Sequence, residues 1–141
     1  MITSAVPRDI IHRYEKIPTS VFTNEEEGVA YVANKVVAAI NKHDETYSSR
    51  EIFDDSQPFV LGLTTGRTAI GLYRELVARH KAGEVSFANV VVFSLDEFYP
   101  IPTEDILSRN YRIRHEFLDH IDIMPENVHI PDGSIPLERI S

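Results

Sequence analysis

Two stretches of the sequence decide the fold: Phe59-Val-Leu-Gly-Leu-Thr-Thr-Gly-Arg-Thr68 and Val90-Val-Val-Phe-Ser-Leu-Asp-Glu-Phe98. Each begins with an apolar run and ends in small or acidic polar residues. Continuous apolar runs of this length are typical of strands that are buried on both faces of a parallel sheet. If the two runs are neighbouring parallel strands, both polar ends emerge at the carboxyl edge of one sheet, where open α/β sheets bind their ligands.

The residues around these strands predict helices. Between the strands, apolar residues at three- and four-residue steps form one face that Gly83 ends: Ala69, Leu72, Tyr73, Leu76, Val77 and His80. An earlier helix is expected over 24–42, where Thr23-Asn-Glu-Glu26 reads as a capping box with Thr23 as the cap and Glu26 reaching back. Strand, helix and strand in this order form a βαβ unit, so we expect an α/β layer fold.

The remaining segments are consistent with a single domain. Residues 1–20 are expected to form a polar arm, and residues 21–141 one α/β domain in which 44–57 and 96–104 are loops. A helix is predicted over Ser108–His120 and a short strand over Val128–Ile130. The apolar face expected for that helix carries Tyr111, Phe117, Leu118 and Ile121.

Composition narrows the classes of partner. The net charge is −8 and no long basic run occurs, which argues against nucleic acid as a partner. Disulfides and thiolate sites are excluded because the chain has no cysteine. No apolar run has the length of a membrane span or a signal peptide, so we expect a cytoplasmic protein without a membrane partner. The six histidines show no HxH or HExxH spacing, and we expect no metal site and no cofactor.

The connector Thr64-Thr-Gly-Arg-Thr68 has the residues of an anion site. The first amides of a helix have no intrahelical acceptor and carry partial positive charge. Thr65 and Thr68 add hydroxyl donors, Gly66 permits close approach of the backbone, and Arg67 adds a full charge. The loop is neither a P-loop nor a GxGxxG motif. The same residues are also typical of an ordinary helix N-terminus in a tight βα turn.

The second polar end supplies candidate acid–base groups. Asp96 and Glu97 directly follow an apolar strand, so we expect at least one carboxylate to be partly desolvated. Desolvation raises a carboxylate pKa toward the range that suits a general base. Such a base beside a bound sugar phosphate can remove a proton next to a carbonyl or imine carbon. Acidic pairs also occur commonly as helix caps and in solvent-exposed loops.

Several ordered motifs resemble one family, and they extend over about residues 21–133. They are Leu61-Gly-Leu-Thr-Thr-Gly-Arg-Thr68, Tyr73-Arg-Glu-Leu76, His80-Lys-Ala-Gly-Glu-Val-Ser-Phe87, Leu95-Asp-Glu-Phe98, Ser108-Arg-Asn-Tyr111 and Pro125-Glu-Asn-Val128. Together they resemble the N-terminal half of glucosamine-6-phosphate deaminases. The resemblance implies a Rossmann-like three-layer α/β fold with a mainly parallel sheet, of which this chain would be an incomplete N-terminal half.

The resemblance also implies a reaction and its residues. Glucosamine 6-phosphate and water would give fructose 6-phosphate and ammonia through an aldose–ketose isomerisation. The family's phosphate loop matches Thr65, Gly66, Arg67 and Thr68, and its proton-shuttling aspartate matches Asp96. Asp96 and Glu97 are therefore the candidate catalytic residues, and the expected partner is a small-molecule sugar phosphate.

The chain departs from the family pattern in its loop. The family loop usually reads Leu-Pro-Thr-Gly-Gly-Thr-Pro, whereas Thr64, Arg67 and Ala69 replace the first proline, the second glycine and the last proline here. If that second glycine needs a positive φ, Arg67 strains the loop. If it permits close approach of the anion, the Arg67 side chain either occludes the anion or clamps it.

The chain also lacks a Gly-Asp-Gly-His segment, whose Asp–His pair assists ring opening in the family. We therefore expect a truncated chain that is inactive, or nearly so, alone. Two alternatives stay open: a sugar-phosphate-binding or regulatory module without catalysis, and a 6-phosphogluconolactonase-like hydrolase. An incomplete sheet leaves an apolar face or edge open, so we also expect a homo-oligomer.

Overall fold

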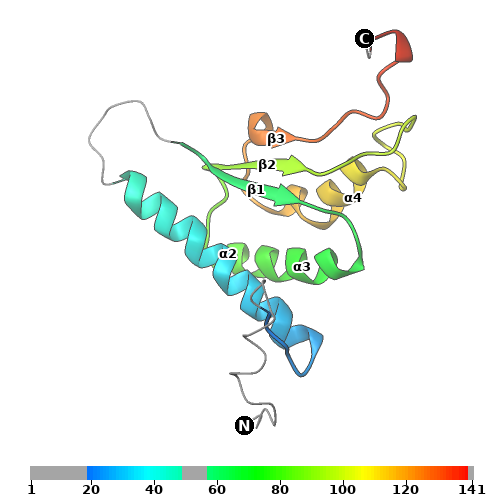
Figure 1. The fold of residues 1–141 in the computed structure, drawn as a ribbon. Coiled ribbons are helices and arrows are strands. Elements are labelled where there is room, and N and C mark those ends of the chain that lie inside the picture. The colour runs from blue at the N-terminus through cyan, green and yellow to red at the C-terminus, as the bar shows by residue number, and fades with distance from the viewer. Residues whose placement is uncertain (1–18, 49–56, 140–141) are drawn as a thin grey trace.

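A computed structural model describes residues 19–48 and 57–139 of the chain. The central element is a three-stranded sheet in the order β1 (Phe59–Leu63), β2 (Val90–Ser94) and β3 (Val128–His129). All pairs are parallel, with Leu61 opposite Val92 and Val92 opposite Val128. The strands lie side by side in Figure 1. The predicted α/β class with a parallel sheet is therefore confirmed.

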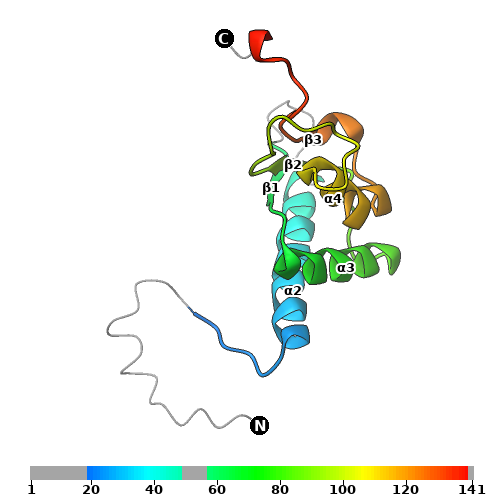
Figure 2. The ribbon, with the colours of Figure 1, turned by 90° about the vertical axis from the view of Figure 1, so that its right-hand side faces the viewer.

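Among the described residues, three α-helices lie on one side of this sheet. They are α2 (Glu25–Ser48), α3 (Arg67–Lys81) and α4 (Arg109–Glu116). Short 3₁₀ turns follow at η1 (Leu118–His120), η2 (Pro125–Asn127) and η3 (Leu137–Arg139). Figure 2 shows α3 and α4 on the same side of the strands. The predicted β1–α3–β2 unit is thus present, and its helix begins at Arg67, within the Thr64–Thr68 connector.

The core forms between the helices and that one face of the sheet. Its members are buried residues of α2, α3, α4 and the strands, including Ile40, Leu76, Val90, Val92, Ile113 and Phe117. Phe117 is fully buried and its ring stacks on Tyr73 at 4.9 Å and meets Phe87 edge-on at 5.4 Å. Aromatic contacts of this kind add to the stabilisation from burial alone.

The opposite face of the sheet is open, which corrects the expectation of strands buried on both sides. Val60 is 57% exposed and Phe93 is 48% exposed. Side chains alternate between the two faces of a strand, and among the described residues the helices cover only one of them. The described part of the chain therefore contributes two layers, a sheet and one layer of helices.

Two helix boundaries also differ from the sequence predictions. The cap of α2 is Asn24, whose Oδ1 accepts from the N–H of Glu27 at 2.8 Å, while Glu27 accepts from the N–H of Thr23 at 3.3 Å. The capping residues are therefore shifted by one position from the predicted Thr23 and Glu26, because Asn is a stronger N-cap than Thr. The helix then runs on to Ser48, so residues 44–48 are helical and not part of a loop. Residues 1–18 of the predicted arm and 49–56 of the predicted loop lie outside the described residues.

The helix expected over Ser108–His120 is shorter. Phe117 leaves helical geometry at φ −141° and ends α4, after which η1 turns the chain. Ile113, which the predicted apolar face omitted, is buried, whereas Tyr111 is 36% exposed. The segment is therefore anchored at Ile113, Phe117 and Leu118. Among the described residues, no helix is long and apolar enough to cross a membrane.

Phe117 gives a test of this core. We expect Phe117→Ala to lower the free energy of unfolding by about 3–5 kcal/mol, because it removes a fully buried ring and leaves a cavity. Leu95→Ala is the control, since Leu95 is 80% exposed and should cost less than about 0.5 kcal/mol. Urea unfolding followed by circular dichroism measures both. Equal effects of the two variants would contradict the proposed core.

Candidate functional site

The two polar stretches leave the sheet side by side. Leu63 lies opposite Ser94, and the N–H of Leu95 donates to the carbonyl of Leu63 at 3.1 Å, so the strand pairing continues to the start of both loops. The connector after β1 and the Asp96–Glu97 loop after β2 therefore begin at the same edge. The topology brings together the two parts that the sequence had separated.

Gly66 shapes the connector. It precedes α3 with φ 148° and ψ 164°, a conformation that favours glycine, and a Cβ placed there would meet nothing within 4 Å. No side chain caps this end of α3, and within its first turn the N–H of Ala69 donates to the carbonyl of Gly66 at 3.2 Å. Among the predicted phosphate-binding residues, Thr65 is half-buried, whereas Gly66, Arg67 and Thr68 are exposed.

Arg67 is not the strained residue of the loop. It is the first residue of α3 and has helical backbone, while the positive φ belongs to Gly66. This corrects the concern that replacing a glycine at position 67 strains the connector. The exposed Arg67 side chain stands at the N-terminus of α3, where it adds a full positive charge to the positive end of the helix dipole.

Tyr73 holds the start of the connector through hydrogen bonds to its backbone. Its hydroxyl donates to the carbonyl of Thr64 at 2.5 Å and accepts from the N–H of Thr64 at 3.1 Å. Burial raises the pKa of Tyr73 above its ordinary value, although the hydrogen bond with Thr64 acts in the opposite direction. Tyr73 therefore remains a neutral donor and acceptor, and it satisfies both backbone groups of Thr64 at the point where the strand ends.

Glu97 caps helix α4. Its two carboxylate oxygens accept from the N–H groups of Phe98, Arg109 and Asn110 and from the hydroxyl of Ser108, at 2.8–2.9 Å. Ser108 in turn accepts from the N–H of Tyr111 at 3.2 Å. Carboxylates at a helix N-terminus are favoured by these free amides and by the helix dipole. Glu97 thus ties the second loop to α4.

This arrangement changes the expected acid–base character of the pair. Burial raises the pKa of Glu97, but the bonds from Asn110, Arg109, Ser108 and Phe98 outweigh it, so the pKa lies below its ordinary value. The expectation of a raised pKa is therefore wrong for Glu97. Its hydrogen bonds favour a positioning role over proton transfer, and the other carboxylate of the pair becomes the stronger candidate base.

Asp96 is the freer carboxylate. Its side chain is 55% exposed, so it is not in the desolvated surroundings expected from the sequence. The nearest cation is Arg109, whose Nε lies 3.7 Å from Asp96 Oδ2 and whose guanidinium lies 4.4 Å from the Phe98 ring centre. Arg109 Nε is buried and has no hydrogen-bond partner among the described residues. Asp96 is therefore available to a ligand and has a cation beside it.

Gly133 supports the Asp96–Glu97 loop from the segment after β3. Its carbonyl accepts from the N–H of Ile101 at 2.9 Å, and an added Cβ would clash with the Phe98 carbonyl and lie 2.6 Å from Ile101 Cγ2. In the sequence, Pro131-Asp-Gly133 is typical of a turn. Because glycine is common in turns, no sequence signal distinguished this close approach of two loops.

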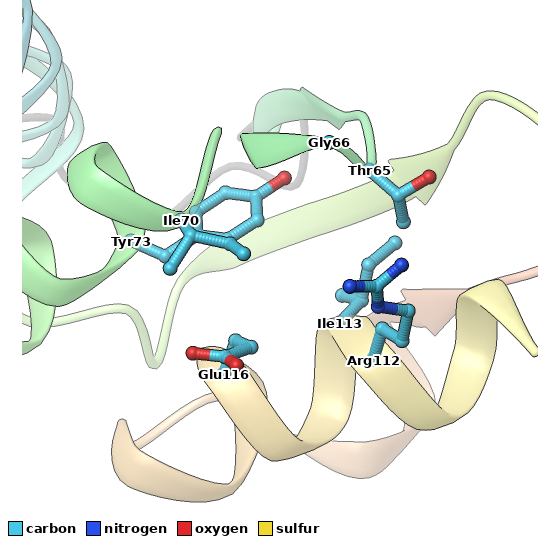
Figure 3. A pocket seen from close by; sticks show the side chains of 7 residues that line it. All are labelled: Thr65, Gly66, Ile70, Tyr73, Arg112, Ile113 and Glu116. Carbon is cyan, nitrogen blue, oxygen red and sulfur yellow. The ribbon is translucent and has the colours of Figure 1, made fainter. Parts of the chain in front are cut away.

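A small hollow lies between the connector and α4 (Figure 3). Its lining residues are Thr65, Gly66, Ile70, Tyr73, Arg112, Ile113 and Glu116. The enclosed space is about 10 Å³, close to the minimum that holds one water molecule. Arg112 and Glu116 had no place in the sequence-based site, since nothing in their spacing from the connector indicated contact. Within residues 19–48 and 57–139, no three His, Asp or Glu side chains gather to hold a metal ion.

These features define a class of protein: a parallel α/β sheet whose carboxyl edge carries an uncapped helix N-terminus beside an acidic loop. Such an edge suits a small anionic ligand. The chain belongs to the family described as glucosamine-6-phosphate isomerases/6-phosphogluconolactonase, whose profile matches residues 23–139. The family resemblance seen in the sequence is thereby confirmed.

Curated relatives share this part of the chain. The glucosamine-6-phosphate isomerase of Candida albicans (strain SC5314 / ATCC MYA-2876) is 38% identical over 114 residues, which cover 81% of this chain and 41% of that protein. The glucosamine-6-phosphate deaminase of Aeromonas hydrophila subsp. hydrophila is 48% identical over 80 residues, covering 57% of this chain and 30% of that protein. The matches therefore extend over less than half the length of these relatives.

Solved structures have the same fold. A monomeric glucosamine-6-phosphate deaminase superposes with a TM-score of 0.67 at 29% identity, covering 83% of this chain and 44% of that chain. The 6-phosphogluconolactonase from Trypanosoma brucei gives a TM-score of 0.62 at 23% identity, covering 86% and 43%. The second likeness concerns the fold alone. In both comparisons the aligned part is less than half of the solved chain.

The Glu97 cap predicts a pH-dependent stability. The folded-state pKa lies below the ordinary 4.5, so the contribution is present above that value and is lost as the pH falls through the folded pKa. Glu97→Gln replaces one accepting oxygen by an amide donor and should cost about 1–3 kcal/mol near neutral pH. Urea unfolding from about pH 7 to about pH 3 should show this difference shrinking.

Glu126→Gln is the matched control, because Glu126 is exposed. It should leave stability near neutral pH unchanged within about 0.5 kcal/mol. A Glu97→Gln variant as stable as wild type near neutral pH, or a difference that persists undiminished at the acid end, would contradict the capping role.

Proposed function

We propose that this chain carries the phosphate-binding loop and the proton-transferring carboxylate of a glucosamine-6-phosphate deaminase-type site. The observation that supports it most is the family match over residues 23–139, combined with the two loops that begin at the paired strand ends Leu63 and Ser94. An anion-accepting loop beside an accessible carboxylate is the arrangement that isomerisation of a sugar phosphate requires.

Each group has a task in this proposal. The amides and side chains of Thr65, Gly66, Arg67 and Thr68 bind the substrate phosphate at the start of α3. Asp96 takes the proton from C2 of the open-chain amino aldehyde and returns it to C1, so the carboxylate is regenerated. In the same conversion O1 takes a proton from the C2 ammonium group, and C2 becomes an imine carbon. Addition of water to the resulting C2 imine then releases ammonia and leaves a ketose phosphate. Glu97 positions Asp96 by fixing the loop to α4.

The deaminase reaction is favoured over the lactonase alternative. The curated relatives described above, at 38% and 48% identity, are an amino-sugar phosphate isomerase and a deaminase. The cited lactonase structure shares 23% identity and supports only the fold. The ring-opening Asp–His segment is absent from the sequence, so we expect the chain alone to bind sugar phosphate with little or no turnover.

We also propose that the chain works in the cytoplasm as a homo-oligomer. Cysteine is absent, as suits a reducing compartment, and the relatives are enzymes of metabolism. The open sheet face with Val60 and Phe93 would be covered by a second copy. Analytical ultracentrifugation should show a dimer that Phe93→Glu dissociates. A wild-type chain that stays monomeric at high concentration would contradict this part of the proposal.

Ligand binding tests the phosphate loop. Glucosamine 6-phosphate at millimolar concentration should raise the melting temperature of the wild-type chain. Gly66→Ala should weaken this binding about tenfold or more, because its φ of 148° is strained for any other residue. Gly62→Ala is the control, since a Cβ on Gly62 would also meet nothing within 4 Å but its φ is not positive.

Two outcomes would contradict the proposal. Unchanged binding by Gly66→Ala would place the phosphate elsewhere. Stabilisation by 6-phosphogluconate but not by glucosamine 6-phosphate would favour the lactonase-like alternative over the deaminase.

A further inference from the structure

The two ends of the hollow between the connector and α4 carry opposite charges: Arg112 lies at one end and Glu116 at the other. At one end Arg112 and Thr65 extend toward each other across the mouth (Figure 3). At the other end Glu116 lies near Tyr73 and Ile70. The enclosed part holds about 10 Å³, which is too small for a phosphate group. An anion bound at the connector would therefore lie over the mouth, between the start of α3 and Arg112.

The charges around the hollow leave Arg112 as its available cation. Glu116 Oε2 lies 3.6 Å from Arg74 Nη2, so this carboxylate already has a cation beside it. Arg109 lies beside Asp96, and Arg114 Nε donates to Asn110 Oδ1 at 2.8 Å. Arg112 makes no side-chain hydrogen bond or ion pair with any residue of the described ranges. Its guanidinium is exposed and directed at the connector.

We infer that Arg112 is a second, cationic wall of the phosphate site and selects a dianionic phosphate monoester. A guanidinium binds two phosphate oxygens through a planar fork, and the α3 amides can bind the remaining oxygen from the opposite side. The connector alone offers amides, hydroxyls and Arg67 from one side only. With Arg112 the site has donors on two sides, which suits a doubly charged group better than a singly charged carboxylate. This inference rests on the phosphate site proposed above.

Arg112 is also a suitable position for such a role. It lies on a helix whose N-terminus Glu97 and Ser108 hold, while the neighbouring Ile113 is buried in the core. The backbone that carries Arg112 is therefore fixed relative to α3 on both sides. Because the Arg112 side chain is exposed, its replacement should change binding without unfolding the chain.

The test is binding of inorganic phosphate and of glucosamine 6-phosphate to the 141-residue chain, measured by isothermal titration calorimetry. Arg112→Ala should weaken both about tenfold or more, as expected for loss of charge-assisted hydrogen bonds. Arg112→Lys keeps the charge without the fork and should retain part of the affinity. Arg114→Ala is the matched control on the same helix and should bind like wild type. Circular dichroism and melting temperature without ligand verify that each variant folds.

The outcomes separate this inference from the proposed function. If wild type binds phosphate and Arg112→Ala binds equally well, the inference on Arg112 is wrong and the phosphate loop stands. Equal losses in Arg112→Ala and Arg114→Ala would show a general charge effect and would also overturn it. If wild type binds neither ligand, the phosphate site itself is wrong.

Discussion

The hydroxyl of Tyr73 is the contact on which the site depends most. It bonds both backbone groups of Thr64, the first residue after β1, at 2.5 and 3.1 Å. Backbone groups at a strand end otherwise need water or another partner. The Tyr73 ring is buried and stacks on Phe117, so its position is set by the core. The core thereby determines where the connector leaves the sheet and where α3 begins.

The second loop is held by the same kind of constraint. Both carboxylate oxygens of Glu97 accept hydrogen bonds at the start of α4. Gly133 packs against the Phe98 carbonyl. Asp96 is the member of the acidic pair that remains accessible to a ligand. Two helices on one face of the sheet therefore position two loops at one edge, and each loop is fixed by a single side chain that is not itself expected to react.

The sequence predicts the βαβ unit well because local signals carry it. The apolar run of β1 and the three- and four-residue spacing of α3 gave the strand at Phe59–Leu63 and the helix that follows it. The sequence assigned Gly66 to close approach of the backbone, whereas its positive φ was found only in the structure. The phosphate-binding role of this connector stays a prediction. The expected parallel pairing of the two strands placed both loops at one edge, and the register of β1 and β2 confirms this pairing.

What the sequence could not predict depends on contacts between distant residues. The capping of α4 by Glu97 needs Ser108 and Asn110, eleven and thirteen residues further on. An apolar run indicates burial but does not say which face is covered, so the open face expected for an incomplete sheet could not be assigned to Val60 and Phe93. Arg112 lies on a different element from the connector, and only the packing of α4 against α3 brings them together.

The central claim is that a phosphate group binds at the start of α3. An NMR titration of the chain with glucosamine 6-phosphate tests it most directly, because each backbone amide reports its own environment. The largest amide shift changes should fall on Gly66, Arg67 and Thr68, with smaller ones around Asp96. Shift changes confined to residues away from this sheet edge, or none at millimolar ligand, would contradict the account.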